Sequence, residues 1–357
     1  FSSRRRHTRY RRSSRGLGDV YKRQADFVNE SIDAWLESVA DERFFLWTHY
    51  YDPHQPFQPP PPYDQLFLDD PYSGEIAYAD EAFGRLMERL EELGVAERTV
   101  VVLTSDHGEG LGEHEEETHS FLLYDTTLRV PLIVRIPVGS GGHVVEAPVG
   151  TVDILPTVLE LLGLPPEEDR HGSSRADSVR TGTEPTSDSF YAETLVPRLV
   201  HGWGELRALV GGDHKYVHGP RPELFDLEND PGELRNLLDD EPELADRMRR
   251  ELSRLIDARS AGEVQAASAP DDETRRRLMA LGYLSGGADS DMEIVERLLS
   301  DGEPPQDHIN EVNDLSRAKL LLLEGRALRA EEVVRGLLES SPDSVMYTEM
   351  LASTLLY

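Results

Sequence analysis

An apolar, β-branched stretch at residues 99–103 leads directly into a loop that contains three glycines. Such a run predicts a buried strand of a mostly parallel sheet, because strands covered on both faces are hydrophobic throughout. The loop begins with Asp106 and His107, two side chains that can bind a metal. Open α/β sheets bind ligands at the carboxyl ends of their strands. The sequence therefore predicts metal-assisted chemistry at this point of an α/β fold.

The neighbouring segments alternate between helix-like and strand-like patterns. Apolar spacing predicts helices over residues 25–39, 75–93 and 152–163, and short buried strands over residues 44–50 and 132–136. Gly94 is expected to end the second helix, because glycine adopts the left-handed conformation common after a helix. This alternation indicates an α/β layer fold.

The pattern changes after residue 200. Two short apolar runs, residues 206–210 and 215–217, flank Gly211-Gly212-Asp213 and predict a hairpin. A helix is expected over residues 242–258. Together these elements suit a small α+β subdomain. The stretch that follows is polar and is interpreted as a linker with one short helix over residues 275–283.

The last fifty residues have helical patterns with a repeat spacing. Ala318 and Leu321 recur about 34 residues later as Ala352 and Leu355, the period of a tetratricopeptide repeat. The alternative is a generic helical hairpin. An apolar helix face that stops at Tyr357 needs a neighbour to bury it, so we expect the chain to be cut within a second repeat.

Composition excludes several classes of function. The net charge of the 357 residues is −31, and residues 1–24 alone carry +8, leaving −39 for the rest. A body this acidic argues against nucleic acid as a partner. Cysteine is absent, which excludes disulfides and thiolate metal sites, and no apolar run is long enough for a membrane span. Residues 1–24 are interpreted as a disordered or non-native basic tail, rather than an arm for nucleic acid or lipid.

Three further histidines are candidate site residues. His49 and His54 flank the start of a proline-rich loop, which would present His54 rigidly to an anion or a leaving group. The alternative is that both belong to an aromatic cluster. His119 follows an acidic run, and alone it is a weak candidate because such runs are usually solvated.

Taken in order, these segments resemble the sulfatase family. The resemblance rests on Phe-Leu-Trp-Thr-His49-Tyr-Tyr-Asp-Pro-His54, on Gly74-Glu-Ile-Ala-Tyr-Ala-Asp80-Glu, on Val-Leu-Thr-Ser-Asp106-His107-Gly-Glu-Gly-Leu-Gly-Glu-His114, on Thr118-His119-Ser-Phe through Arg129-Val-Pro131, and on Glu223-Leu-Phe-Asp226 through Asp230-Pro231 and Asn236-Leu. It covers residues 25–285. The tail resembles repeats that follow a sulfatase domain in some bacterial proteins.

The resemblance implies an α/β, alkaline-phosphatase-like sandwich with a mostly parallel sheet, present here only in part. Residues 25–200 would be the C-terminal part of that domain, 201–260 its small α+β subdomain, 261–307 a linker and 308–357 an all-α tetratricopeptide-like tail. The implied activity is hydrolysis of a sulfated small molecule or glycan with one divalent cation, Ca²⁺. Asp106 and His107 would be metal ligands, and His54 and His119 catalytic residues.

The chain departs from the family in two ways. A Cys/Ser-X-Pro/Ala-X-Arg motif, matured to formylglycine, and a first pair of metal-binding aspartates are expected upstream and are absent here. We therefore expect an inactive fragment of a sulfatase. The alternatives are a phosphodiesterase or phosphonate hydrolase of the same superfamily, and a non-catalytic tetratricopeptide scaffold with a degenerate hydrolase domain. A protein partner for the tail and a bacterial periplasmic or other extracytoplasmic location are compatible with the sequence.

Overall fold

The computed structural model describes residues 24–137, 141–166, 171–186, 189–260 and 297–356. The chain divides into two compact units, one up to Val100 with the short segment from Ile136, and one made of the remainder. The expected basic tail, all but its last residue, and the short helix over residues 275–283 lie outside the described residues. The same holds for most of the expected linker.

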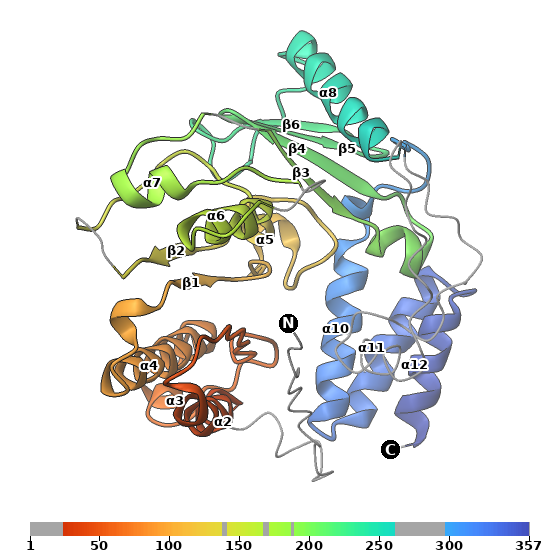
Figure 1. The fold of residues 1–357 in the computed structure, drawn as a ribbon. Coiled ribbons are helices and arrows are strands. Elements are labelled where there is room, and N and C mark those ends of the chain that lie inside the picture. The colour runs from red at the N-terminus through yellow and green to blue at the C-terminus, as the bar shows by residue number, and fades with distance from the viewer. Residues whose placement is uncertain (1–23, 138–140, 167–170, 187–188, 261–296, 357) are drawn as a thin grey trace. The chain divides into compact units, whose positions relative to one another are not determined.

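Helices make up the first unit: α2 (Gln24–Val39), α3 (Tyr63–Leu66), α4 (Pro71–Glu92) and the 3-10 turn η1 (Ala96–Arg98) (Figure 1). Asp70 caps α4 by accepting a hydrogen bond from the Ser73 backbone N–H, and Pro71 occupies the first turn, where no N–H is needed. Gly94 follows the helix with φ +65°. Two predicted helices and the predicted glycine end are therefore confirmed.

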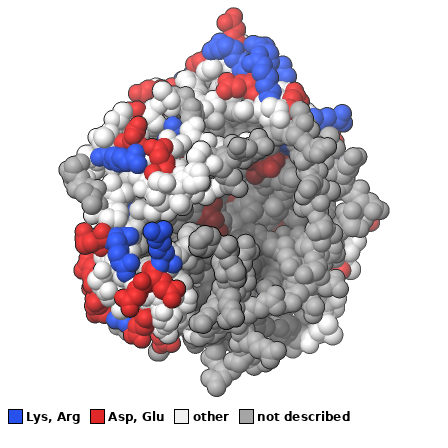
Figure 2. Space-filling view, viewed as in Figure 1, with Lys and Arg blue, Asp and Glu red and all other residues white. Residues whose placement is uncertain are grey.

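Small side chains let α2 and α4 approach closely. Ala25 and Ala82 are fully buried, and the Asn29 amide donates to the Ala82 carbonyl oxygen at 2.8 Å. Arg85 of α4 forms an ion pair with Asp26 of α2 at 2.5 Å. Figure 2 shows acidic and basic side chains intermingled over these helices, as expected for exposed helix faces laced by ion pairs.

The strand predicted over residues 44–50 is wrong. This segment has no strand partner among the described residues, and Phe45 and Trp47 are 83% and 76% exposed. An apolar run has the composition of a buried strand, but only a hydrogen-bonded neighbour makes it one.

Both sheets of the second unit are antiparallel. Strand β1 (Val101–Thr104) pairs with β2 (Leu132–Arg135), and the other sheet has the order β3 (Ser189–Thr194), β4 (Leu206–Gly211), β5 (His214–His218), β6 (Glu223–Asp226). The expectation of a mostly parallel sheet is therefore wrong for the described residues. β1 is also only half-buried, and Ile133 of β2 is exposed. Hydrophobic pattern locates a strand but does not determine the direction of its partner.

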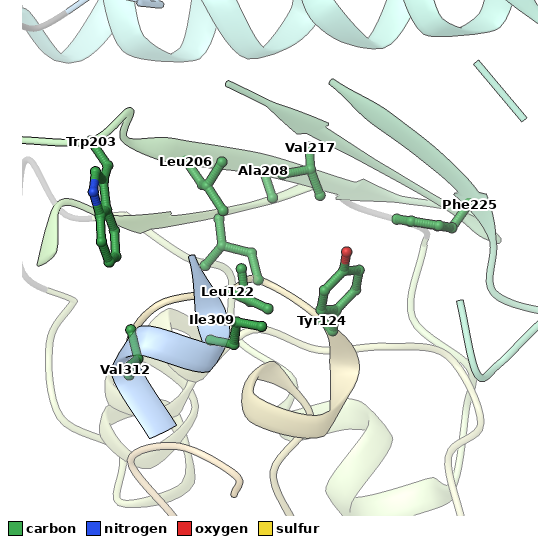
Figure 3. Close-up of a cluster of buried hydrophobic side chains, with 10 residues drawn as sticks. Leu122, Tyr124, Trp203, Leu206, Ala208, Val217, Phe225, Ile309 and Val312 are labelled. Carbon is green, nitrogen blue, oxygen red and sulfur yellow. The ribbon is translucent and has the colours of Figure 1, made fainter. Parts of the chain in front are cut away.

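The four-stranded sheet is buried on both faces, and alternation along its strands assigns each side chain to a face. Leu209, Tyr216 and Leu224 pack against α8 (Pro242–Ser260), where Leu252 is fully buried. The opposite face carries Ala208, Val217 and Phe225 over a second apolar cluster (Figure 3). The predicted hairpin and the predicted helix at residues 242–258 are confirmed.

Short helices also belong to this unit, among them η3 (Thr151–Asp153), α6 (Ile154–Leu161), α7 (Ala176–Thr181) and η4 (Pro197–His201). The helix predicted over residues 152–163 corresponds to η3 and α6. Arg175 reaches back to Asp153 at 2.8 Å, a nearly buried ion pair that joins the start of α7 to the start of α6.

Three helices form the C-terminal part: α10 (Ile309–Leu323), α11 (Ala327–Ser340) and α12 (Val345–Leu356), preceded by η5 (Pro305–Asp307). Ala318 and Ala330 are fully buried, which allows close packing of the first two helices. Helices thus occupy the predicted positions, while their identity as tetratricopeptide repeats stays a prediction. In the part of the chain that the structure describes, no helix combines the length and apolarity required to cross a membrane.

Candidate metal centre

Asp106 and His107 follow the last residue of β1. The Ser105 hydroxyl donates to the His107 carbonyl oxygen at 2.7 Å, and the His107 backbone N–H donates to Asp106 Oδ1 at 3.1 Å. These bonds place His107 Nε2 3.9 Å from Asp106 Oδ1. Both side chains are partly exposed, 56% for Asp106 and 30% for His107. A carboxylate oxygen and an imidazole nitrogen therefore face the same space.

The hydrogen bonding of His107 leaves the nitrogen nearer to Asp106 available. Nδ1 lies 2.6 Å from the Gly108 carbonyl oxygen, which can only accept, so Nδ1 carries the proton. Nε2 then presents its lone pair, as in most histidines that bind a metal. Within the described ranges, no three His, Asp or Glu side chains are placed to hold an ion together. The pair fits a divalent cation by its donor atoms but supplies only part of a coordination shell.

His119 joins this pair through its ring. The imidazoles of His107 and His119 stack with centroids 4.0 Å apart and planes 27° apart. His119 Nδ1 lies 3.0 Å from Glu109 Oε1, and the Glu109 side chain is only 3% exposed. Glu109 thus fixes the ring orientation of His119. The structure brings together three of the four predicted site residues.

Two glycines of the motif are required by close backbone contacts. The N–H of Gly108 donates to the Thr127 carbonyl oxygen, and that of Gly110 donates to the Thr118 carbonyl oxygen. A Cβ on Gly108 would lie 2.1 Å from the Thr126 carbonyl oxygen, and one on Gly110 would lie 2.5 Å from that of Glu116. Any side chain here would push the loop apart. The expected role of these glycines, approach to a ligand, is therefore accompanied by a packing role.

Two acidic-run residues also organise the loop. Glu116 is fully buried, and burial raises its pKa to about 8. It accepts the Phe121 backbone N–H at 3.2 Å. His114 stacks on Tyr124 with ring centroids 3.5 Å apart, and its Nε2 lies 3.0 Å from the Gly232 carbonyl oxygen. Glu116 and His114 are thus folded into the loop, whereas Glu113, Glu115 and Glu117 of the same run are exposed.

Sequence reasoning missed Lys215. Its side chain is fully buried in β5, and its Nζ lies 2.7 Å from Asp125 Oδ1 and 2.6 Å from Glu233 Oε1. Asp125 begins the short helix α5 (Asp125–Leu128), shortly after the loop that bears Asp106 and His107. Its backbone N–H donates to the Glu233 carboxylate. A lysine beside Tyr216 and Val217 in a predicted strand was the available signal, because lysine is almost never fully buried without a partner.

His54 belongs to the first unit, whereas the other three residues belong to the second. Its Nδ1 donates to the Gln55 carbonyl oxygen at 2.6 Å, and its ring stacks on Tyr51 at 4.3 Å. Glu75 of α4 accepts the Gln58 backbone N–H at 2.7 Å and so supports the same loop. Glu75 is 6% exposed, and burial raises its pKa to about 8.

Two family models match this chain in succession. The model described as Sulfatase matches residues 5–164, and the one described as N-sulphoglucosamine sulphohydrolase, C-terminal, matches residues 112–258. The loop that bears Asp106 and His107 lies within the first match. The chain is similar to the sulfatase family over residues 5–258. The first match begins at residue 5, inside the segment interpreted as a tail, whose nature stays a prediction.

Curated relatives of this chain are distant. It is 27% identical to the uncharacterized sulfatase YidJ of Escherichia coli in an alignment 281 residues long, and the match covers 63% of the chain and 55% of the relative. It is 25% identical to an arylsulfatase of Clostridium perfringens, covering 66% of the chain and 58% of the relative. It is 30% identical to an ulvan-active sulfatase of Formosa agariphila, over 47% of the chain and 34% of the relative. The chain thus spans about half the length of the first two relatives.

Solved structures support the fold. A crystal structure assigned as the sulfatase yidJ from Bacteroides fragilis gives a TM-score of 0.59 at 20% identity, covering 65% of this chain and 58% of that one. A phosphonate monoester hydrolase from Silicibacter pomeroyi gives 0.57 at 23% identity, covering 67% and 60%. The mixed α/β, sulfatase-like fold is therefore confirmed, with the small antiparallel sheets described above.

Proposed function

We propose that this chain is the metal-binding and C-terminal part of a sulfuric ester hydrolase. The observation that carries the proposal is the Asp106–His107 pair at the end of β1, with His107 Nδ1 bonded to Gly108 and Nε2 facing the Asp106 carboxylate. Two successive sulfatase-family matches cover this pair and the subdomain behind it.

The residues of the chain take distinct roles in this proposal. Asp106 and His107 hold one divalent cation, with Ca²⁺ proposed because a carboxylate and further oxygen ligands suit a hard ion. When bound, such an ion neutralises negative charge on the sulfate oxygens. His119, oriented by Glu109, donates a hydrogen bond to the sulfate group. His54 contacts the sulfate or protonates the departing oxygen.

A formylglycine nucleophile and a first pair of acidic ligands would complete the proposed site. The chain contains neither a cysteine nor a Ser-X-Pro/Ala-X-Arg sequence from which formylglycine would form. Loss of a nucleophile can lower the rate by roughly 10⁶. We therefore propose that the 357-residue chain by itself does not turn over sulfate esters. The proposed substrate class is a sulfated sugar or aryl compound, supported by the ulvan-active and aryl-sulfatase relatives. The C-terminal helices are proposed as tetratricopeptide-like.

Metal binding tests the proposal on the chain itself. Titration with CaCl₂ and MnCl₂ by calorimetry should give one site, of Kd about 10⁻⁴–10⁻³ M for the weak Ca²⁺ class, that the D106N/H107A variant lacks. The matched control is D213N/H214A, because Asp213-His214 is the same dipeptide at a hairpin turn. An equal loss of binding in both variants, or none in either, would contradict the assigned ligands.

Ester turnover tests the reaction class. The chain alone should not hydrolyse 4-nitrophenyl sulfate. If its gene supplies upstream sequence, the longer protein should hydrolyse this ester, and D106N should abolish the activity. Turnover of phenyl phosphonate esters without sulfate esters would favour the phosphonate hydrolase alternative. Turnover of sulfate by the 357-residue chain would refute the proposed dependence on an upstream nucleophile.

A further inference from the structure

One amide side chain of α10 holds both sides of a turn in the site loop, which we define as residues 105–121. Asn313 Nδ2 donates to the Glu115 carbonyl oxygen at 2.6 Å, and Asn313 Oδ1 accepts the Glu117 backbone N–H at 3.1 Å. The partners are 196 and 198 residues apart in sequence. Only a side chain with a donor and an acceptor in this fork can satisfy both groups at once.

The turn held by Asn313 is a strained part of the loop. His114 and Glu115 have φ angles of 53° and 65°, which L-residues other than glycine rarely adopt. Such conformations persist only where the surroundings over-determine them, and they cluster at functional sites. Asn313 bonds the carbonyl of the second strained residue and the N–H two residues later. This amide is therefore placed to maintain the strained turn.

Helix α10 belongs to the same unit as the site loop and is held there by buried contacts. Ile309 and Val312 of α10 lie in the same buried cluster as Leu122 and Leu123, which follow the site loop (Figure 3). The His308 ring stacks on Trp203 with centroids 4.5 Å apart. Because the helix is fixed by these contacts, Asn313 provides a fixed reference point for the loop.

A short chain of contacts links the turn to the predicted ligands. The Gly112 N–H donates to the Glu116 carbonyl oxygen, and the Gly110 N–H donates to that of Thr118, each at 2.9 Å. The next residue, His119, bonds to Glu109 and stacks on His107. A shift of residues 115–117 would therefore move His119, which stacks on the His107 ring.

We propose that Asn313 is a positioning residue for the Asp106–His107 site, and that the C-terminal helices belong to the framework of this site rather than forming a separate module. The effect of Asn313 on the loop conformation is inferred from the contacts above. Its effect on metal binding rests on the proposed function. Asn310, one turn earlier on α10, supplies a matched control. Among the described residues its side-chain amide has one hydrogen-bond partner, Glu115 Oε2, at 3.4 Å between exposed side chains.

The experiment compares N313L with N310L in the full chain. Leucine keeps the branched shape and the number of side-chain heavy atoms of asparagine, and it removes both hydrogen bonds. Deuterium exchange of the amides in residues 108–118 should become at least tenfold faster in N313L and stay unchanged in N310L. Exchange of α8 and of strands β4 to β6 should be unchanged in both variants. Equal exchange of the loop in N313L and the wild type would overturn the proposal.

Affinity for Ca²⁺ provides the readout that a merely structural role would not move. N313L should weaken binding at least fivefold while the urea midpoint of unfolding changes little. If N313L does not fold, N313D serves in its place, because it keeps the acceptor for Glu117 and loses the donor to Glu115. An unchanged Ca²⁺ affinity with a loosened loop would overturn the positioning role.

Loop exchange and Ca²⁺ affinity together distinguish failure of the proposed metal site from failure of the proposed role of Asn313. A wild-type chain that binds no Ca²⁺ contradicts the proposed function, while loop exchange still decides whether Asn313 holds the turn. A wild-type chain that binds Ca²⁺, with N313L indistinguishable from it in exchange and affinity, refutes the role of Asn313 alone.

Discussion

His107 and His119 stack on each other at 4.0 Å although twelve residues separate them in the chain. The stack forms because residues 108–118 fold back on themselves, with the Gly110 N–H bonded to the Thr118 carbonyl oxygen. The geometry of the candidate metal centre is thus a property of the whole loop.

His119→Ala should destabilise the chain by about 1–3 kcal/mol, because it removes a hydrogen-bond partner from the buried Glu109 carboxylate. Urea unfolding at pH 7 measures the change. His171→Ala is the matched control at an exposed histidine and should shift the free energy of unfolding by less than about 0.5 kcal/mol. Equal effects of the two substitutions would show that the His119–Glu109 bond contributes nothing specific.

Lys215→Met should cost about 3–5 kcal/mol, since it leaves the Asp125 and Glu233 carboxylates without their shared buried cation. Arg235→Met breaks a surface pair with Asp240 whose side chains are 72% and 58% exposed, so it should cost less than about 1 kcal/mol. Chemical denaturation monitored by circular dichroism compares the two. A Lys215→Met chain as stable as Arg235→Met would contradict the buried ion-pair interpretation.

Glu75→Gln should flatten the dependence of stability on pH. Burial raises the pKa of Glu75 from 4.5 to about 8, so the folded state binds the proton more tightly than the unfolded state. The stability that Glu75 contributes is therefore fully present below pH 4.5 and is lost as the pH rises through about 8. Between these values the difference between wild type and Glu75→Gln should change by at most about 1.4 kcal/mol per pH unit.

Stability curves from pH 4 to 9 test this dependence. Glu88→Gln, on the exposed face of the same helix α4, should leave the pH profile of the wild type unchanged. The prediction fails if Glu75→Gln and the wild type lose stability in parallel as the pH rises.

Gly108→Ala should disrupt the site loop, because its Cβ would meet the Thr126 carbonyl oxygen at 2.1 Å. We expect a loss of at least about 2 kcal/mol together with weaker Ca²⁺ binding. Gly84→Ala in α4 has nothing within 4 Å of the new Cβ and should stabilise the chain by about 0.5–1 kcal/mol. The opposite signs of the two stability changes distinguish a packing requirement at Gly108 from the general conformational effect of replacing glycine. A Gly108→Ala chain as stable as the wild type would exclude the packing requirement.

Local patterns were sufficient for the helices and for the hairpin. The apolar face of α4, its end at Gly94 and the pairing of β4 with β5 each depend on residues within one or two turns of chain. Strand partners were not predictable in this way. The run over residues 44–50 and the direction of β2 depend on which backbone lies alongside, and that is decided by packing between distant segments.

For the site, the sequence by itself determined which chemistry is available: Asp106, His107, His54 and His119 are donors and acids of the required types, and their order matches a family. Only the tertiary structure decided how three of them meet, through the Glu109 carboxylate and the contacts of Gly108 and Gly110. It also revealed Lys215, which bonds to Asp125 about 90 residues away, and Asn313, which bonds to Glu115 about 200 residues away. Burial and hydrogen bonding depend on such distant neighbours, so the local pattern of residues along the sequence does not predict them.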